Sequence, residues 1–446
     1  ETWDDRVHLT YWEKWRGWEQ EAAEKMVDQF NRSQDRIFVH YIPTSRIDQK
    51  SLLAIVGGNP PDIIGIWGLN VPQFADAGAL MGLDEFRRRD GLTDEHYLPH
   101  YLKICQRNGK TVAVPNTPAS IGLFYNREHF RRHADELRAA GLDPNRPPQT
   151  IEELDKYAEI LTEYGPDGKP EVYGFLPTEP GYFSMIWGYH FGGQLVDPNS
   201  GEMTTDSPEN VDAYAWVKSY AETYGRDQVL KFRSGFGTSD SPQNAFISGK
   251  VSMIMQGVWF PSFVVRHRPH MDYGAAPFPS AEGVPGPRGF IQCDVLAIPR
   301  GAPHPEEAWE FLHWVQTEGL ATVCRLQGKH LPIREVPENF YDGHPNPFVK
   351  TFAELARSPH SFRMPQNLIW MQYQKEMADA FDHIWRWQPP RDELEGLTGE
   401  KRRDKLRELC REQVRRTLAD IRVRMQRRLD EQRQRRARRS DQEAAQ

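Results

Sequence analysis

Apolar and polar positions along the first part of the chain predict strands separated by helices. Residues 6–12 (RVHLTYW) alternate in polarity, as expected of a strand, and residues 17–33 carry apolar side chains at helical spacing. Further strands are predicted at residues 37–43 and 60–67, and the helix between them ends at a pair of glycines. This βαβαβ order indicates an α/β fold with a mostly parallel sheet and helices on both faces.

A second α/β region is predicted from about residue 120 to residue 270. Strands are then expected at residues 273–279 and 294–300, followed by a helix pair or one broken helix at residues 304–327. Helices should also occupy much of residues 347–387. A chain of 446 residues is too long for one ordinary core, so two or more domains are expected.

The end of the chain has a different pattern. Residues 400–436 form one long helical pattern, in which Val414, Leu418, Ile421 and Met425 fall on one side. After residue 390 there are 18 Lys/Arg against 12 Asp/Glu, which leaves 38 against 51 for the rest of the chain. An acidic body and a basic tail are therefore expected to be separate parts of the molecule.

The basic run RRLDEQRQRRARR in this tail raises the question of nucleic acid. Aromatic side chains are not interleaved with it, and acidic residues punctuate the helix before it, so no nucleic-acid partner is expected. The pattern instead favours a solvated amphipathic helix that docks on the body, pairs with another chain or touches an anionic surface.

Five segments carry motifs that can be compared with known families. They are LLAIVGGNPPDIIGIW (52–67), TVAVPNTPASIGLFYNREHF (111–130), NAFISGKVSMIMQGVWF (244–260), DVLAIPRGAPHPEEAWEFLHWV (294–315) and LPIREV (331–336). In this order they resemble the extracellular solute-binding proteins of ABC importers, in the carbohydrate-binding family that includes maltodextrin-binding proteins. The resemblance extends over residues 7–390.

The resemblance implies a two-lobed, periplasmic-binding-protein-like fold with three interlobe crossings and a C-terminal helical tail. It implies a first lobe of residues 1–116 and 273–331, a second lobe of residues 117–272 and 332–390, and a tail of residues 391–446. The implied function is the extracytoplasmic capture of a carbohydrate, either an oligosaccharide or a glycoside. Hinged closure of the lobes would hold it for delivery to the membrane subunits of an ABC permease. A periplasmic or extracellular monomer without a cofactor is expected, and a lipid anchor is left open.

The same resemblance points to the residues that would bind the sugar. Planar aromatic side chains can cover the C–H faces of a sugar, and charged or amide groups can bind its hydroxyls. The stretch YWEKWRGW offers both at the end of the first strand, where ligands of open α/β sheets bind. The candidate ligand-binding residues are Trp12, Glu13, Trp15, Trp67, Tyr182, Phe183, Trp259, Gln292, Asp294 and Trp370.

Some candidates have a structural alternative, and one segment departs from the family. Trp12, Trp15 and Trp18 could pack under the following helix as core, and Trp18 is expected to belong to that helix. Arg325 and His330 could reach the ligand or only cap a helix. Many family members have a glycine pair before DVLAIP, where this chain has GFIQCD, so the identity of the ligand stays open.

Other function classes have less support in the sequence. A glycoside hydrolase needs two facing carboxylates at a defined separation, and no spacing pairs the acidic residues. A serine-hydrolase elbow, a zinc-protease helix and a phosphate-binding loop are all missing from the sequence, so no enzyme is expected. A ligand-free adaptor on the same fold is the alternative function.

Metal binding and disulfide formation are also not expected. The segment HFRRH places His129 and His133 one helical turn apart, but without an evident third ligand, and surface histidines are the simpler interpretation. The four cysteines lie 188, 31 and 86 residues apart, which is the spacing of neither a metal knuckle nor a disulfide framework.

Overall fold

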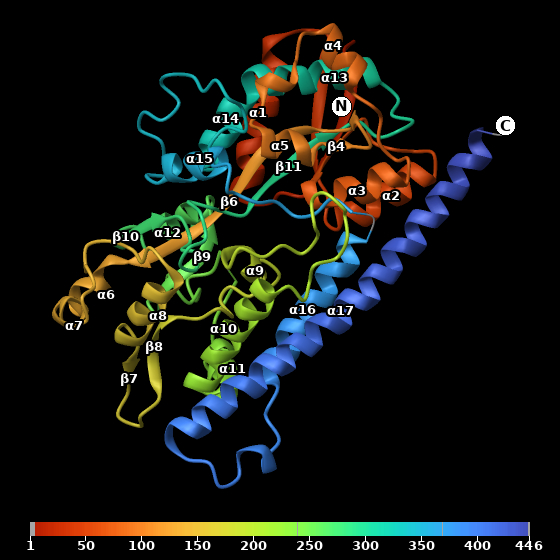
Figure 1. Cartoon of the computed structure of the whole chain (residues 1–446). Helices are drawn as coiled ribbons and strands as arrows, with labels where there is room; N and C mark the ends of the chain where they lie inside the picture. Colours follow the sequence, from red (N-terminus) through yellow and green to blue (C-terminus); the bar gives the residue numbers. More distant parts are fainter. Residues whose placement is uncertain (1–4, 239, 368, 445–446) are drawn as a thin grey trace. The chain divides into compact units, whose positions relative to one another are not determined.

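The computed structural model describes residues 5–238, 240–367 and 369–444 (Figure 1). Contacts between residues divide the chain into two compact units. Unit 1 comprises Glu1–Gly122, Gly257–Ser262 and Gly289–Gln366, and unit 2 comprises Leu123–Gln256, Phe263–Arg288 and Asn367–Gln446. The predicted lobe ranges stay a prediction, and they differ from the units chiefly at residues 332–366, which pack with unit 1.

The sheet of unit 1 begins with three parallel strands, as the alternating pattern predicted. β1 (Val7–Glu13) lies between β2 (Ile37–Pro43) and β3 (Ile63–Trp67). β11 (Ile291–Ala297) then runs antiparallel to β3 and to the first part of β6 (Val114–Asn126). The antiparallel strand β11 therefore brings a distant part of the chain to the edge where β3 ends.

Helices cover both faces of this sheet. In chain order they are α1 (Trp18–Ser33), α2 (Ile47–Val56), α3 (Val71–Asp76), α4 (Asp84–Arg89), α5 (Pro99–Ile104), α13 (Pro305–Trp314), α14 (Leu320–Leu326) and α15 (Val349–Arg357). Side chains of α1, α13 and α14 share one hydrophobic cluster with Ile63, whereas side chains of α2, α3 and α5 share another with Ile64. Successive residues of one strand thus enter opposite cores, which explains the unbroken apolar run in its sequence.

The predicted broken helix at residues 304–327 is confirmed. A π-helical turn at Val315–Gly319 joins α13 to α14. The shorter elements of unit 1 are the 3₁₀ turns Gly68–Asn70 and Asp94–His96 and the two-residue strands β4 (Gln106–Arg107) and β5 (Lys110–Thr111).

Unit 2 contains a smaller sheet and most of the helices of the second half. Its strands are β7 (Glu163–Tyr164), β8 (Pro170–Phe175), β9 (Val251–Gly257) and β10 (Tyr273–Ala276), and its helices are α6 (Arg127–Arg132), α7 (Ala134–Ala139), α8 (Ile151–Ile160), α9 (Trp187–His190), α10 (Pro208–Tyr224), α11 (Arg226–Arg233), α12 (Phe260–His267), α16 (Trp370–Arg386) and α17 (Gly399–Ala444). β8 pairs with β9 in parallel, and β10 pairs with β6 in antiparallel. Its core is aromatic: the Phe175 ring packs within 6.5 Å of Trp187 and Trp216.

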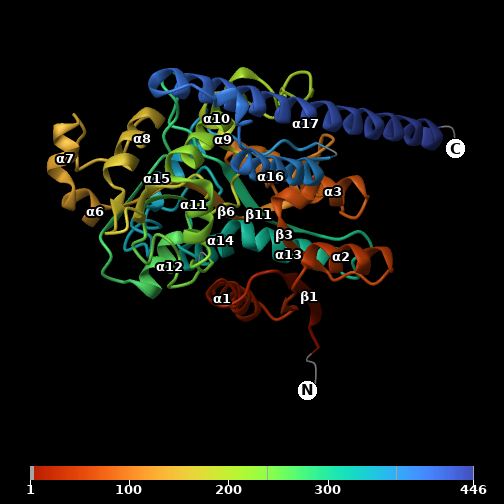
Figure 2. The same ribbon diagram turned by 90° about the horizontal axis from the view of Figure 1, so that it is seen from below.

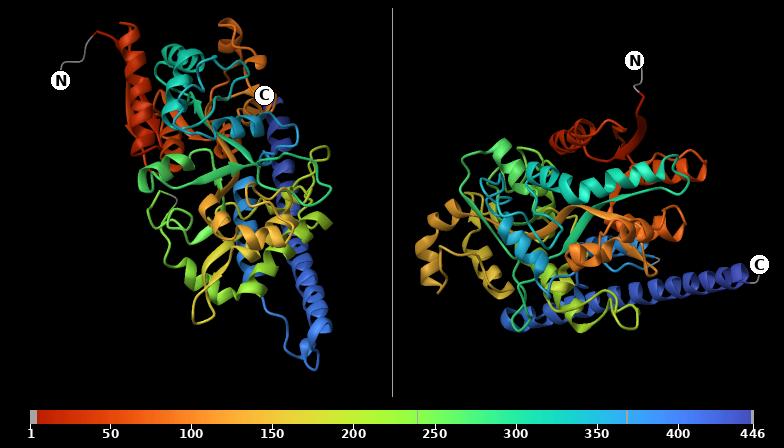
Figure 3. Two further views of the ribbon diagram at one scale, coloured as in Figure 1. Left: turned by 90° about the vertical axis from the view of Figure 1, so that its left-hand side faces the viewer. Right: turned by 90° about the horizontal axis from the view of Figure 1, so that it is seen from above.

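The C-terminal tail is one helix, α17, preceded by a 3₁₀ turn at Asp392–Leu394. Its apolar side is buried against α10 and α16, and the buried residues are Cys410, Val414, Leu418, Ile421, Met425 and Leu429. Figures 2 and 3 show α17 running alongside these two helices. Of the alternatives left open by the sequence, docking on the body is therefore confirmed for the part of the helix up to Leu429.

Replacing Leu418 by alanine tests this docking. The side chain is fully buried, so its truncation should lower the free energy of unfolding by about 2–5 kcal/mol. The control Val423→Ala alters an exposed position of the same helix and should change stability by no more than about 0.5 kcal/mol. Urea denaturation followed by tryptophan fluorescence measures both, and equal small effects would contradict the docking.

Candidate functional site

The carboxyl ends of β1 and β3 gather three of the predicted site residues in unit 1. Glu13 is the last residue of β1 and Trp67 the last residue of β3, and Asp294 of β11 lies opposite Trp67 in the antiparallel register. The Glu13 side chain crosses over Gly65, where a Cβ atom would lie 1.8 Å from Oε2 of Glu13. Any larger residue at Gly65 would displace the carboxylate from this edge.

Lys14 joins two of these carboxylates. Its Nζ lies 3.0 Å from Oε1 of Glu13 and 3.0 Å from Oδ1 of Asp294. The hydroxyl of Tyr11 donates a hydrogen bond of 2.7 Å to the other oxygen of Glu13. Glu13 is fully buried, and both of its carboxylate oxygens accept hydrogen bonds inside the protein.

A second lysine extends the group from the far side of Asp294. Nζ of Lys329 lies 3.2 Å from Oε1 of Glu19 and 3.9 Å from Oδ2 of Asp294. The hydroxyl of Thr117 accepts a bond of 3.1 Å from Lys329 and donates one of 3.1 Å to Asp294. We call Glu13, Lys14, Glu19, Asp294 and Lys329 the ionic cluster; with every member ionised its net charge is −1.

Burial and charge pairing shift the pKa values of Glu13, Lys14 and Tyr11. Burial raises the pKa of Glu13, and the Lys14 ammonium offsets that rise only in part. Burial alone would lower the pKa of Lys14, but attraction to Asp294 and Glu13 leaves it raised. Burial and the Glu13 carboxylate hold the pKa of Tyr11 well above its usual range, so the hydroxyl stays a donor. Lys14 is consequently a firmly charged ammonium at neutral pH.

Two indole rings flank the Lys14 ammonium. Its Nζ lies 4.8 Å from the ring centre of Trp15 and 5.5 Å from that of Trp67. Lys329 approaches Trp15 as well, at 5.5 Å. Trp15 is only 4% exposed, whereas Trp67 is 45% exposed. Trp67 is therefore the aromatic surface that this part of unit 1 presents to solvent, and Trp15 is the buried ring beneath the lysines.

The other predicted residues of unit 1 lie in different surroundings. Trp12 is partly buried on the opposite face of β1, against the cluster that contains Ile64 and Ile66. Gln292 is partly buried in β11 and pairs in register with Ala119 of β6.

Trp259 is held close to the loop that carries Lys329. Its ring covers the backbone of Gly257, where a Cβ atom would lie 2.2 Å from the indole. The Asn346 amide donates hydrogen bonds of 2.8 Å to the carbonyls of both Val258 and Gly328. Asn346 thereby holds Val258, which precedes Trp259, close to Gly328, which precedes Lys329. The indole of Trp259 is half-buried.

The predicted residues of unit 2 form a separate set. Tyr182 is 45% exposed and donates a hydrogen bond of 2.7 Å to Oε1 of Gln256. The ring of Phe183, which is buried, meets that of Tyr182 edge-on at 4.4 Å. Trp370 is 2% exposed at the start of α16, and among the described residues its indole N–H finds no acceptor. Tyr182 thus offers an open aromatic face in unit 2, as Trp67 does in unit 1.

Two further candidates have structural roles. Arg325 donates to the backbone carbonyls of Phe340, Asp342 and Gly343, so it fastens a loop. His330 is buried, with Nε2 2.9 Å from the Ser120 hydroxyl and 3.2 Å from that of Tyr101.

The candidate residues chosen from the sequence did not include Lys14, Glu19, Thr117 or Lys329. In the sequence, Lys329 is marked only by the preceding Gly328, a residue type that commonly follows the end of a helix. In the structure Gly328 follows α14 with a φ of 68°.

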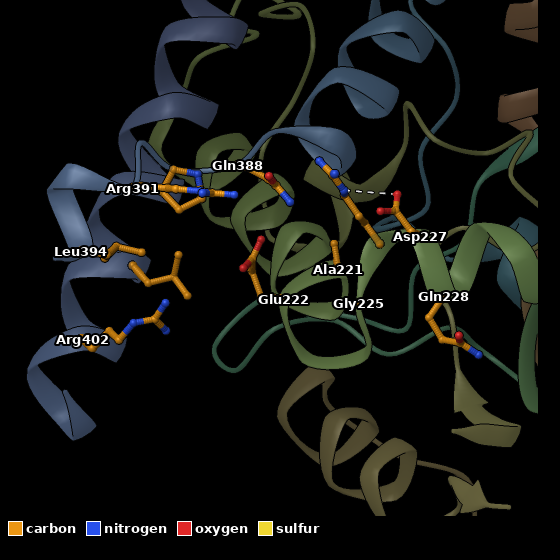
Figure 4. A pocket seen from close by; sticks show the side chains of 12 residues that line it. Ala221, Glu222, Gly225, Asp227, Gln228, Gln388, Arg391, Leu394 and Arg402 are labelled. Carbon is orange, nitrogen blue, oxygen red and sulfur yellow. Dashed lines mark ion pairs between the residues drawn. The ribbon is translucent and has the colours of Figure 1, made fainter. Parts of the chain in front are cut away.

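Two cavities within single units lie away from these residues. In unit 2 a cavity of about 500 Å³ separates α10 and α11 from the start of α17. Figure 4 shows Arg391 and Arg402 on the α17 side and Glu222 on α10, with Arg226 paired to Asp227. In unit 1 a cavity of about 730 Å³ lies between α1, α14 and the loop that Arg325 fastens. None of the predicted ligand-binding residues lines either cavity.

The described residues also bear on metal and membrane chemistry. Within them, no group of three or more His, Cys, Asp or Glu side chains is placed to hold a metal ion. His129 bonds the Ser252 hydroxyl, and His133 pairs with Glu163. The four cysteines are free and buried. No described helix has the length and apolar character needed to cross a membrane.

Replacing Lys14 by methionine should lower the free energy of unfolding by about 3–5 kcal/mol, because Glu13 and Asp294 would keep their charge without their shared partner. The raised pKa of Lys14 means that this contribution is complete at neutral pH and is lost as pH rises through the folded-state pKa of Lys14 in alkaline solution. The deficit should shrink as pH falls, because the Glu13 carboxyl, whose pKa burial already raises, can take up a proton.

Denaturant unfolding at several pH values measures this effect. The double variant Glu13→Gln/Lys14→Met should cost less than the two single changes together, since no charge at Glu13 is then left unpaired. Lys103→Met, at an exposed position of the same unit, is the matched control. Additive costs in the double variant would contradict the pairing.

His330 should make the protein less stable in acid. Burial lowers its pKa to about 4, whereas histidine in an unfolded chain titrates near 6.5. The unfolded chain therefore binds a proton first as pH falls, and His330 should account for a loss of about 2 kcal/mol between neutral pH and about pH 5. Denaturation curves of His330→Gln should be flatter over this range by that amount, and a curve parallel to the wild type would show that the group does not titrate this way.

Comparison with known proteins places the fold and the family. The pattern of the bacterial extracellular solute-binding proteins matches residues 16–321. An uncharacterized ABC transporter extracellular-binding protein of Pyrococcus horikoshii is 22% identical over 387 residues, which cover 83% of this chain and 82% of that protein. The sn-glycerol-3-phosphate-binding periplasmic protein UgpB of Brucella abortus is 24% identical over 300 residues, 64% of each chain.

Solved structures agree with this placement. CpMnBP1 with mannobiose bound has a TM-score of 0.73 and 25% sequence identity, over 91% of this chain and 100% of that chain. A cyclo/maltodextrin-binding protein complexed with maltotetraose has a TM-score of 0.67 and 18% identity, over 95% and 98%. These matches confirm the two-lobed periplasmic-binding-protein fold inferred from the sequence motifs. Because the family pattern covers more than half of the chain, this protein belongs to the bacterial extracellular solute-binding proteins.

Proposed function

We propose that this protein is the substrate-binding component of an ABC importer and that it captures an uncharged carbohydrate, either an oligosaccharide or a glycoside. The observation that carries this proposal is the ionic cluster beside the exposed ring of Trp67. An exposed indole covers the C–H face of a sugar ring, and fixed charged groups next to it bind the hydroxyls at its edge.

The charge of the ionic cluster bears on the class of ligand. Lys14 and Lys329 are each already paired with carboxylates, and the cluster as a whole is −1 when every member is ionised. A phosphate ester would bring further negative charge to a group with no excess of positive charge, which is unfavourable at short range. The relative UgpB binds sn-glycerol-3-phosphate by name, whereas CpMnBP1 is seen with mannobiose. The arrangement in this chain favours the second kind of ligand.

Two of the remaining predicted residues, Tyr182 and Phe183, form a second aromatic group in unit 2. Tyr182 is half-exposed in unit 2, and the buried Phe183 supports its ring. We include Trp12, Trp259, Gln292 and Trp370 as candidates from the family resemblance. A ligand that contacts aromatic residues of both lobes would bind more tightly to a closed form, and it can favour closure only through that difference.

The alternative function is a ligand-free adaptor on the same fold. An adaptor would use its exposed aromatic side chains for a protein partner and would not respond to sugars. A carbohydrate-acting enzyme has less support, because Glu13 and Asp294, the carboxylates nearest Trp67, are both held by Lys14. The closed form would be recognised by the permease, and a monomer with or without a lipid anchor is compatible with that role.

Trp67→Ala should weaken sugar binding about tenfold or more, because truncating a tryptophan that anchors a ligand commonly has this cost. The measurement begins with a panel of mannose and glucose oligosaccharides and glycerol 3-phosphate, followed by tryptophan fluorescence and a thermal melt. A bound sugar raises the melting temperature by mass action. Trp67→Phe keeps an aromatic ring and should retain most of the affinity.

Tyr164→Ala is the matched control, because it removes an exposed aromatic ring from β7, outside the predicted site. It should leave sugar affinity unchanged. Full affinity in Trp67→Ala would remove Trp67 from the site. If no compound of the panel changes the fluorescence or the melting temperature of the wild type, the result favours the adaptor function. A response to glycerol 3-phosphate alone would contradict the proposal of an uncharged ligand. Slow consumption of a sugar would indicate an enzyme.

A further inference from the structure

The long helix α17 has two parts with different surroundings. Up to Leu429, one side of the helix is buried against α10 and α16. Among the side chains that the structure describes, the last ion pair from α17 to the rest of unit 2 joins Arg433 to Glu202, and Arg433 also donates to the carbonyl of Gly201. Beyond Arg433 the helix continues to Ala444. Figures 1 and 2 show this end extending past α16 and α10, on which the first part packs.

The sequence explains why docking stops there. The apolar stripe advances by three or four residues through Leu418, Ile421, Met425 and Leu429. Continued at the same spacing, it would next reach position 432 and then positions 436 and 439, where the sequence has Gln, Arg and Arg. The apolar stripe of the sequence therefore ends at Leu429. Gln432 and Arg435 still line a shallow cavity with Ile369 and Gln372 of unit 2.

The same turns are strongly basic. Residues 432–440 contain five arginines and no acidic residue, and Asp441 and Glu443 follow them before the helix ends. Residues 1–390, by contrast, carry an excess of 13 negative charges. Arg435 and Arg438 are both exposed. By contrast, the exposed arginines nearer the middle of the helix are mostly paired; Arg424, for example, binds Glu376 and Arg427 binds Glu431. We call residues 432–440 the basic arm.

We propose that the basic arm rests on an anionic phospholipid surface. A rigid helix and the ion pair of Arg433 with Glu202 fix the arm to unit 2. The four arginines beyond Arg433 match the negative headgroups of such a surface. Within the arm the single apolar residue is Ala437, so binding occurs at the level of the headgroups and without insertion into the hydrocarbon. The arm would hold a carrier of the extracellular solute-binding family near the membrane, independently of which sugar it carries.

Other occupants fit the arm less well. Single-stranded nucleic acids are bound by basic grooves combined with aromatic side chains, and the arm contains no aromatic residue. A protein partner held on a helix face normally buries a hydrophobic stripe, and the stripe of α17 is already covered up to Leu429. A planar anionic surface requires only the charge that the arm provides.

Vesicle flotation with the full chain tests the proposal. The protein should bind phosphatidylcholine vesicles that contain phosphatidylglycerol, should not bind vesicles of phosphatidylcholine alone, and should be released by salt. Each arginine at such a surface contributes roughly fivefold in affinity. The double variant Arg435→Glu/Arg438→Glu should therefore bind at least about 25-fold more weakly, and truncation after Gln434 should abolish binding.

The matched control is Arg403→Glu/Arg407→Glu, which makes the same change of charge at exposed positions of α17 about 48 Å away along the helix. It should keep most of the vesicle binding. A thermal melt of every variant verifies the fold, and because the sugar titration is a separate readout, loss of vesicle binding leaves the proposed transport function intact.

Three results would overturn the proposal. The first is equal binding to neutral and anionic vesicles, and the second is equal loss of binding in the control and the arm variant, which would reflect only net charge. The third is an absence of vesicle binding by the wild type, including the case in which single-stranded DNA or an acidic protein binds the arm instead.

Discussion

The structure of unit 1 depends on the pairing of Lys14 with Glu13 and Asp294. Glu13 is fully buried at the end of β1, and an isolated carboxylate there would cost several kcal/mol. Lys14 compensates that cost only because β11 runs antiparallel to β3 and places Asp294 within 3.0 Å of the ammonium. Gly65 is the complementary constraint, because the carboxylate occupies the space that a side chain there would need. The charge pairing therefore fixes the relative positions of three strands at the edge where ligands of such sheets bind.

The same pairing gives the proposed sugar site its chemical character. Since the lysines are neutralised within the protein, the ionic cluster acts as a rigid set of polar groups with little net charge rather than as an anion trap. The Lys14 ammonium also stabilises the position of the exposed Trp67 indole, because it lies 5.5 Å from the centre of that ring. A rigid aromatic surface loses little conformational entropy when a sugar binds, which favours affinity for an otherwise well-hydrated ligand.

The sequence predicted the parts of this arrangement that follow from local patterns. Strand and helix alternation located β1 to β3 and their helices, and the motif segments identified the family and the two-lobed fold. The position of Glu13 and Trp67 at strand ends followed from the same reasoning. The pairing of Lys14 with Asp294 could not be predicted, because the two residues are 280 positions apart and meet only through an antiparallel register. Burial was equally hidden: Trp15 and Trp67 look alike in the sequence, yet one is 4% exposed and the other 45%.

The tail shows how a local pattern can predict two behaviours in one helix. The spacing of Val414, Leu418, Ile421 and Met425 predicted an amphipathic helix, and these residues are buried on unit 2. The pattern did not reveal which surface would cover them, since α10 and α16 form that surface only after unit 2 has folded. Where the stripe gives way to arginine, the helix has no apolar reason to stay on the body, and its direction is set by the docked part alone. A continuous helix is stiff over this length, so the docked turns determine where the basic arm is held.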